Sequence, residues 1–322
     1  MSEEKLVFLD AGSVGDDFVW PDYADFGKVV MHDNTTKEQT AERVKDATFI
    51  LTNKVYISAE HMAGAPNLRY IGVLATGFNQ VDIKAAAARG IPVCNVPDYS
   101  TNSVAQHVFT LALLLCGRAD RLAATVRDGQ WSKSVHFCYW EKPIIDLYGK
   151  TMGIVGFGNI GAAVGRIAHG FGMNVLAYAP RRKPAPDFVP FAFVGLEEMF
   201  RASDLISLHC PLNAESKGMV NASLLGLMKK SAFIINTARG PLINEEDLLR
   251  ALQGGSIAGA GLDVIAVEPM ADDNPLRFVE NCLITPHVAW CSVESRMRLM
   301  DMVYENIRAF LDGRPQHVVN GV

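Results

Sequence analysis

The stretch from Gly156 to Gly161 reads G-F-G-N-I-G, a glycine spacing that can cradle a diphosphate. The first glycine permits a tight turn, the second lets the backbone approach a pyrophosphate, and the third lets a helix pack closely on a strand. A helix that begins here offers unpaired N–H groups and the positive end of its dipole to the phosphates. We expect dinucleotide binding by Gly156, Phe157, Gly158, Asn159, Ile160 and Gly161.

The elements around these glycines support the interpretation, because the glycine string alone is weak evidence. Residues 151–155 are expected to form a short buried strand, residues 162–171 a helix and residues 175–178 a second strand. A glycine string between a strand and a helix, with another strand following, is the dinucleotide-binding fingerprint. The alternative is a glycine-rich turn in some other α/β protein.

Compact apolar segments alternate with helical stretches along the rest of the chain, which predicts parallel sheets covered by helices. Two long apolar helices are expected at 103–118 and 292–310, where the chain would cross between two domains. The further strands are expected at 5–10, 48–52, 70–75, 91–94, 205–209, 232–236, 260–264 and 282–285.

The chain has 322 residues, more than one domain usually contains. Because the glycine string lies in its middle, a separate α/β unit precedes the nucleotide fold. We predict an α/β protein of two doubly wound parallel-sheet (Rossmann-like) domains. The dinucleotide-binding domain, 100–287, is inserted into a flavodoxin-like substrate domain made of 1–99 and 288–322. A cleft between two domains is a preferred ligand site.

The composition is that of an ordinary soluble globular protein, with 49% hydrophobic and 20% charged residues. The net charge of −5 argues against a nucleic-acid surface. The acidic beginning differs from a secretory signal, and the apolar stretch at 108–116 is too short to span a bilayer. The cysteines form no C-x-x-C pair, and no cluster has metal-ligand spacing. We expect a cytoplasmic protein with no metal, nucleic-acid or membrane partner.

Three polar residues follow the ends of expected strands in the second half of the chain, where open α/β sheets bind ligands. They are Arg239, Glu268 and His287. An arginine fork can hold a carboxylate and polarise the adjacent carbonyl. Histidine titrates near neutral pH and can donate a proton, and a glutamate can orient its ring and favour its charged form. Together with a hydride donor, this set suits the reduction of a 2-oxo acid.

The segments 236–240, 261–269 and 285–290 resemble the D-isomer-specific 2-hydroxyacid dehydrogenases, and the resemblance covers essentially the whole chain. Segments 76–82, 139–141 and 287–290 are most similar to the glycerate dehydrogenase (hydroxypyruvate reductase) branch. The resemblance implies reduction of hydroxypyruvate or glyoxylate to D-glycerate or glycolate with NAD(P)H, and a catalytic role for Arg239, Glu268 and His287. The alternatives are a reductase of bulkier 2-oxo acids and a non-catalytic, corepressor-like scaffold that senses dinucleotides.

The end of the second nucleotide-fold strand bears on which cofactor is used. NAD enzymes of this fold usually carry an acid about 20 residues beyond the first glycine, bonded to the ribose. Ala179 stands at that place, and Arg181 and Arg182 follow. Without the acid a 2′-phosphate is not repelled, and either arginine can pair with it. We therefore expect NADP(H), with NAD(H) as the alternative if the arginines form only a basic surface loop.

Other contacts are expected near these elements. Val104 is expected beside the nicotinamide ring, and the resemblance places Asp263 on the carboxamide, the alternative being a turn acid after a strand. The resemblance also implies that the amides of Ala75, Thr76 and Gly77 bind the substrate carboxylate. Asn53 and Lys54 follow a strand and are expected to line the substrate side, although Lys54 can equally be a surface residue. The strand exits Cys210, Pro211, Thr237 and Ala238 are expected to contact the cofactor.

Two further features complete the expectations. His107 and His209 are expected to be packed or near the cofactor, to be hydrogen-bonded, and not to be acid catalysts. The aromatic stretch 131–148 lies outside any expected helix or strand and fits a dimerisation arm, as in the resembled family, whose subunits join through their nucleotide domains. The alternative is a loop folded on its own domain. In a dimer, Trp140 is a candidate to reach the neighbouring active site.

Overall fold

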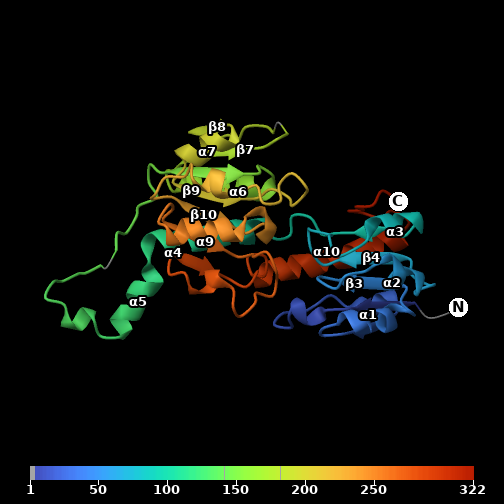
Figure 1. The fold of residues 1–322 in the computed structure, drawn as a ribbon. Helices are drawn as coiled ribbons and strands as arrows, with labels where there is room; N and C mark the ends of the chain where they lie inside the picture. Colours follow the sequence, from blue (N-terminus) through green and yellow to red (C-terminus); the bar gives the residue numbers. More distant parts are fainter. Residues whose placement is uncertain (1–3, 141, 182) are drawn as a thin grey trace. The chain divides into compact units, whose positions relative to one another are not determined.

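The computed structural model describes residues 4–140, 142–181 and 183–322, which divide into two compact units (Figure 1). One unit consists of Met1–Ser100 and Cys291–Val322, and the other of Thr101–Trp290. The expected boundaries, after residues 99 and 287, lie one and three residues before those of the units. Substrate binding by the first unit and dinucleotide binding by the second stay predictions.

The first unit contains a five-stranded parallel sheet in the order β2-β1-β3-β4-β5. Every side chain of β3 and β4 is buried, because central parallel strands are covered on both faces. Strand β2, at the edge of the sheet, was not predicted; it has only four residues, and they are half-buried or exposed. The strands are β1 (Lys5–Phe8), β2 (Lys28–Met31), β3 (Phe49–Thr52), β4 (Tyr70–Val73) and β5 (Val93–Cys94). The helices are α1 (Lys37–Val44), α2 (Ala59–Ala63), α3 (Ile83–Ala88) and α10 (Val293–Leu311).

The second unit contains a seven-stranded parallel sheet in the order β12-β11-β10-β9-β6-β7-β8. The order reverses between β6 and β9, and ligands of open α/β sheets bind beyond the carboxyl ends at such a switch point. Both sheets are doubly wound, which confirms the expected fold class. The strands are β6 (Thr151–Val155), β7 (Asn174–Tyr178), β8 (Phe191–Phe193), β9 (Leu205–Leu208), β10 (Phe233–Asn236), β11 (Gly259–Leu262) and β12 (Cys282–Ile284).

Helices cover both faces of the seven-stranded sheet. On one face α4 and α6 enclose a core cluster, and on the other α7, α8 and α9 enclose a second cluster. No helix among the described residues combines the length and the apolar character that crossing a membrane requires. The helices are α4 (Thr101–Gly117), α5 (Ala119–Arg127), α6 (Asn159–Gly170), α7 (Leu196–Ala202), α8 (Ala222–Leu225) and α9 (Glu245–Gln253).

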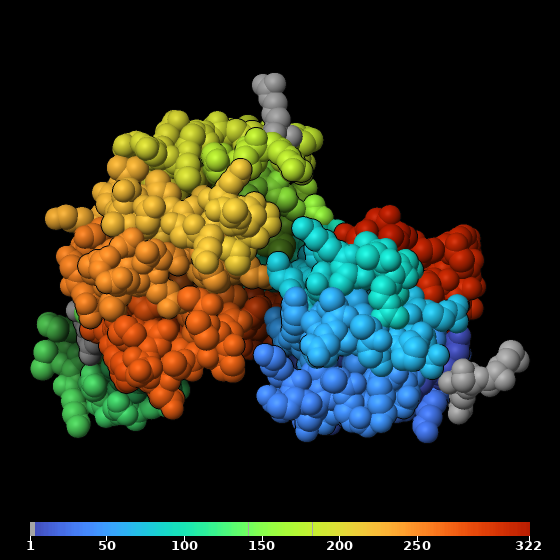
Figure 2. Space-filling view, turned by 45° about the vertical axis from the view of Figure 1, so that its right-hand side comes forward, coloured from blue at the N-terminus to red at the C-terminus, as the bar shows by residue number. Residues whose placement is uncertain are grey.

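An arm, defined as residues 118–140 and 142–148, leaves the second unit after α4 (Figure 1). It contains α5, a short 3-10 turn at Trp131–Lys133 and otherwise irregular chain. Arg121 and Lys142 both donate to Glu280 Oε1 at 2.7 Å, which ties the arm to the domain. Figure 2 shows the described part of the arm in green beside the orange segment that follows α9.

Candidate active site

The glycine turn joins β6 to α6 as the spacing predicts, although α6 begins at Asn159 rather than at residue 162. Gly156 has a φ of +95°, and a Cβ there would lie 2.7 Å from the Cys210 nitrogen. A Cβ on Gly161 would collide with the Gly156 carbonyl oxygen. At Gly158, by contrast, a Cβ would meet nothing within 4 Å. The turn is thus closely packed on the protein side and open at Gly158, where a pyrophosphate is expected.

The six residues of the turn do not all face the same way. The Phe157 ring is buried and packs on Phe191 and Phe193, with ring centroids 5.0 and 5.6 Å away. Ile160 packs against the same core cluster, whereas Asn159 is exposed at the first position of α6. Because its ring is buried in the apolar core, a contact between Phe157 and the cofactor stays a prediction for the main chain alone.

The other expected cofactor residues lie along the same edge of the sheet. Thr237, directly after β10, has a buried hydroxyl with no hydrogen-bond partner among the described residues. A buried hydroxyl without a partner is costly, so a polar group of a ligand is expected to satisfy it. This hydroxyl, the start of α6 and the open Gly158 together fit a dinucleotide.

The remaining cofactor residues expected from the sequence lie in α4 and after the carboxyl ends of β7, β9 and β10. Val104 is buried in the first turn of α4, and Ala238 is half-buried after β10. Cys210 and Pro211 follow β9, with Cys210 Sγ 3.8 Å from Met219 Sδ. Ala179 follows β7 and packs against the core, and Arg181 is exposed beyond it. Arg182 lies outside the described residues.

Glu268 and His287 are brought together from two loops at the sheet edge. His287 Nδ1 lies 2.6 Å from Glu268 Oε2, and Glu268 Oε1 accepts a hydrogen bond from the Ile265 amide at 3.2 Å. The His287 side chain is 22% exposed, so the ring remains accessible on its other side. Because Nδ1 faces the carboxylate, Nε2 is the nitrogen available to a ligand.

Arg239 follows β10. The last residues of β10 pair in register with β11, and β11 pairs with β12. Its Nη1 donates to the Ala238 carbonyl at 2.7 Å, and its main-chain oxygen accepts from Asn236 Nδ2 at 2.9 Å. A Cβ on Gly240 would collide with the Ile265 carbonyl, so the arginine turn packs directly on the loop that leads to Glu268. Arg239 and the His287–Glu268 pair therefore lie on the same side of one sheet, the side formed by the carboxyl ends of its strands.

Asp263 follows β11, the strand between β10 and β12, and its carboxylate is bonded within the protein. Its side chain is 0% exposed, and its oxygens accept hydrogen bonds from Thr285, Val288 and Ala289. These hydrogen bonds are the ones expected if Asp263 is a turn acid after a strand, here one that organises the loop after β12. A contact with the nicotinamide stays a prediction.

The two other histidines of this edge are engaged within the protein. His209 Nε2 lies 2.8 Å from Ser207 Oγ, and burial lowers the pKa of His209 to about 3. His107 Nε2 lies 2.9 Å from Thr285 Oγ1. Both are hydrogen-bonded, and His209 is neutral at physiological pH.

The substrate-side residues were predicted in the first unit. Ala75, Thr76 and Gly77 follow β4, and Asn95 Nδ2 anchors the Thr76 carbonyl at 2.7 Å. Asn53 is buried, and its side chain donates to Ser13 Oγ at 2.9 Å, so Asn53 is engaged inside the domain. Lys54 next to it is exposed.

One residue that the sequence did not reveal holds this loop. The buried Asp10 carboxylate accepts from the Asn53 amide at 2.9 Å and from the Lys54 amide at 2.5 Å. Burial raises the pKa of Asp10, and the loop amides partly offset that effect. In the sequence, the role of Asp10 is indicated only by its place as an acid after the strand β1, and many acids with no such role stand at such places.

An open parallel sheet with a glycine turn at its switch point, an arginine and a His–Glu pair at the same edge defines a dinucleotide-dependent oxidoreductase. The chain belongs to the D-isomer specific 2-hydroxyacid dehydrogenase family, whose NAD binding domain matches residues 109–289. It is thus an NAD(P)-dependent enzyme, and the expected family is confirmed. Among the described residues there is no group of three or more His, Cys, Asp or Glu side chains that could hold a metal ion.

Two curated relatives match over almost the full chain. A hydroxypyruvate reductase from Blautia hydrogenotrophica is 43% identical, over 98% of this chain and 99% of its own length. A glycerate dehydrogenase from Methylorubrum extorquens is 40% identical, with the same coverage of 98% and 99%. The branch of the family predicted from the sequence is therefore the one that these relatives represent.

Solved structures of the family share the fold. D-lactate dehydrogenase from Aquifex aeolicus, complexed with NAD and lactic acid, superimposes with a TM-score of 0.85 at 28% identity, covering 99% of this chain and 100% of that chain. An NADPH-dependent glyoxylate/hydroxypyruvate reductase from Sinorhizobium meliloti, in complex with NADP and malonate, gives 0.83 at 27% identity, covering 99% and 97%. One of these neighbours holds NAD and the other NADP, so the likeness supports a nicotinamide nucleotide of either kind.

Proposed function

We propose that the enzyme reduces hydroxypyruvate or glyoxylate to D-glycerate or glycolate. The observation that carries this proposal is the hydrogen-bonded pair of His287 and Glu268, which follows the carboxyl ends of the same parallel sheet as Arg239. The relatives that act on these small oxo acids, at 40–43% identity, support the choice of substrate.

The roles of the residues follow from their geometry. When bound, the nicotinamide supplies a hydride to the carbonyl carbon. His287 donates the proton from Nε2 to the carbonyl oxygen, since its Nδ1 is held by Glu268. The carboxylate of Glu268 stabilises the imidazolium and orients the ring. Arg239 holds the substrate carboxylate with its planar fork and polarises the neighbouring carbonyl.

The substrate-side residues complete this scheme. The amides of Ala75, Thr76 and Gly77, in a loop beyond the carboxyl end of β4, suit a carboxylate oxygen. Lys54 offers an exposed positive charge on the loop that Asp10 holds. Because the side chain of Asn53 is bonded inside the domain, we assign it to loop structure rather than to the substrate.

The favoured cofactor is NADP(H). Ala179 stands where an NAD enzyme of this fold usually has an acid, and the exposed Arg181 follows two residues later. A guanidinium at this place can pair with a 2′-phosphate. The NADPH-dependent reductase from Sinorhizobium meliloti is a precedent on the same fold.

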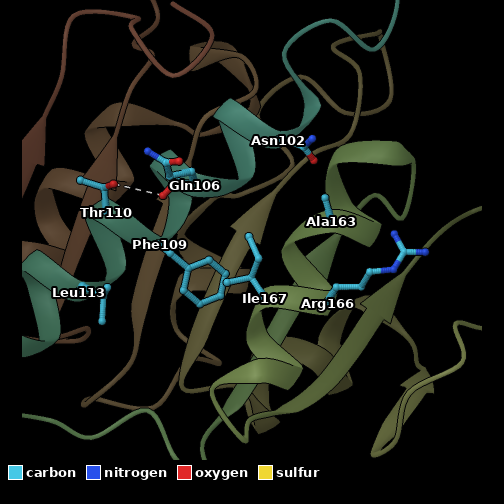
Figure 3. Close-up of a pocket in the computed structure, with 8 residues that line it drawn as sticks. All are labelled: Asn102, Gln106, Phe109, Thr110, Leu113, Ala163, Arg166 and Ile167. Atoms are coloured by element: carbon cyan, nitrogen blue, oxygen red, sulfur yellow. Dashed lines mark hydrogen bonds between the residues drawn. The ribbon is translucent and has the colours of Figure 1, made fainter. Parts of the chain in front are cut away.

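The favoured assembly is a homodimer through the nucleotide-binding unit. The arm carries Phe137, 89% exposed, together with the exposed Trp140 and Tyr148. Between α4 and α6 lies an open pocket of about 490 Å³, where Phe109 and Ile167 point toward each other (Figure 3). An exposed aromatic arm and an apolar pocket on one chain can cover each other across a two-fold axis. The arm also bonds within itself, from Trp131 Nε1 to the Phe137 carbonyl at 2.9 Å.

A matrix of cofactors and substrates tests the proposed function directly. The purified enzyme is assayed with NADPH and with NADH on each of four substrates: hydroxypyruvate, glyoxylate, pyruvate and phenylpyruvate. We expect the enzyme to be cytoplasmic. The highest kcat/KM is expected for hydroxypyruvate or glyoxylate. Preference for phenylpyruvate would point to a reductase of bulkier oxo acids, and cofactor binding without turnover would point to a sensing scaffold.

A further inference from the structure

A buried carboxylate organises the loop that carries His287. Asp263 directly follows β11, and its side chain is 0% exposed. Its Oδ1 accepts from Thr285 Oγ1 at 2.6 Å and from the Val288 amide at 2.9 Å, while Oδ2 accepts from the Ala289 amide at 2.9 Å. Hydrogen-bond donors from both sides of His287 therefore converge on one carboxylate.

A histidine from another element extends this network. His107, in α4, lies with Nε2 2.9 Å from Thr285 Oγ1 and 3.5 Å from Asp263 Oδ1. Since the Thr285 hydroxyl donates its one proton to Asp263, its oxygen accepts from His107, whose Nε2 then carries a proton. A directed chain of hydrogen bonds thus runs from α4 through Thr285 to Asp263.

The loop held by this chain has an unfavourable backbone conformation. His287 has a φ of +56°, in the left-handed region that residues with a Cβ rarely adopt. Its amide donates to the Asp263 carbonyl at 2.8 Å and to the Thr285 carbonyl at 2.9 Å. Such a conformation persists only where the surroundings enforce it. Here the carboxylate and carbonyl of Asp263 bind His287 and the two residues after it.

We propose that Thr285 and His107 are positioning residues for His287. They fix the Asp263 carboxylate, which keeps the His287 loop in its left-handed turn and the ring nitrogen Nδ1 within bonding distance of Glu268. Neither residue touches the reacting atoms in this scheme. The proposal rests on the proposed function for its kinetic consequences, because the ring it positions is the assigned proton donor.

The test compares Thr285→Val, which removes the hydroxyl at nearly constant shape, with Thr285→Ser, which keeps it. Thr285→Val is expected to lower kcat about tenfold, equivalent to one lost hydrogen bond, with both KM values within about twofold. Thr285→Ser is expected to restore at least about half of wild-type kcat. All assays are run well below the melting temperature of each variant.

A second pair of variants tests the link to α4. His107→Gln keeps an N–H donor near the Nε2 position, whereas His107→Phe removes it. If the residues act in one chain, the double variant His107→Phe/Thr285→Val loses no more activity than Thr285→Val alone. Additive losses in the double variant would contradict a single chain.

A measurement without turnover separates this proposal from the proposed function. In protein labelled with 15N-histidine, the Nδ1 proton of His287 bonded to Glu268 gives a downfield NMR signal, assigned by its loss in His287→Asn. We expect Thr285→Val to shift or broaden this signal and Thr285→Ser to leave it in place. Inactivity of the wild-type enzyme on every oxo acid would refute the proposed function but leave this readout intact. An unchanged signal in Thr285→Val, or equal kcat in the Val and Ser variants, would overturn the positioning role.

Discussion

His287 Nδ1 lies 2.6 Å from Glu268 Oε2, although 19 positions separate the two residues in the chain. The contact forms because β11 and β12 are parallel neighbours, so the loops after them leave the same edge of the sheet. Glu268 is itself fixed through the Ile265 amide. The pairing leaves one imidazole nitrogen for the substrate, and this division between the two nitrogens is the basis of the first prediction.

Replacing the proton donor is expected to slow the chemistry without weakening cofactor binding. His287→Asn should lower kcat at least ~100-fold, the usual contribution of general acid–base catalysis. Steady-state kinetics measure kcat, and quenching of protein fluorescence by the reduced cofactor measures its binding. If kcat stays at the wild-type level while the protein is correctly folded, His287 has no part in proton transfer.

Replacing the carboxylate anchor is expected to act on substrate affinity. Arg239→Lys keeps the charge but loses the bidentate fork, so KM for the oxo acid should rise about tenfold or more. KM for the nucleotide serves as the internal control and should change little. An unaltered KM for the oxo acid would assign Arg239 to structure, through its bond to the Ala238 carbonyl.

Cofactor choice is expected to depend on the end of β7. Wild-type enzyme should show a higher kcat/KM with NADPH than with NADH, and Ala179→Asp should reverse the order, because a carboxylate repels the 2′-phosphate and bonds the ribose hydroxyls. Arg181→Ala should weaken NADPH use while leaving NADH use nearly constant. A clear NADH preference of the wild-type enzyme would contradict the assignment.

The assembly is expected to depend on the arm and the pocket between α4 and α6. Light scattering coupled to gel filtration should give twice the 35.1 kDa of one chain. Phe137 lies in the arm, and Leu113 lines the pocket between α4 and α6. Phe137→Ser and Leu113→Glu should each shift the mass toward the monomer, since a polar group would have to be buried in the contact. Val19→Ser is the matched control, because Val19 is 92% exposed and lies in the first unit, outside the arm. A wild-type monomer at micromolar concentration would refute the dimer.

Acid is expected to destabilise the fold through His209. Burial lowers its pKa to about 3, so the unfolded chain, with an ordinary histidine pKa of ~6.5, binds the proton more readily. The free energy of unfolding is therefore highest above a pH of about 6.5, where His209 is neutral in both states. It falls progressively as the pH drops from there toward 3, because only the unfolded chain binds the proton. In urea unfolding at pH 7 and pH 5, the loss of stability should be smaller for His209→Gln than for wild type. If both proteins lose the same stability between pH 7 and pH 5, protonation of His209 does not contribute to the destabilisation by acid.

Much of this protein was predictable from short stretches of sequence. The turn at Gly156 and Gly161 is recognisable because close backbone packing leaves room for no other residue type. Strands such as β6 and β10 read as apolar runs because both of their faces are buried. The order of Arg239, Glu268 and His287 after strands of a parallel sheet was enough to anticipate their common edge.

Other features depend on which strands become neighbours and which side chains meet there. The edge strands β2 and β8 have only four and three residues, too few to show a strand period, and their side chains are half-buried or exposed. The ring of Phe157 joins the core, because Phe191 and Phe193 reach it from a strand that the sequence did not reveal. The hydrogen bonds that the Asp263 side chain accepts could not be read from the sequence, since its donors lie 22 to 26 residues away in the chain. Local residue types determine turns and strands, whereas a hydrogen-bond partner exists only once distant strand ends lie side by side.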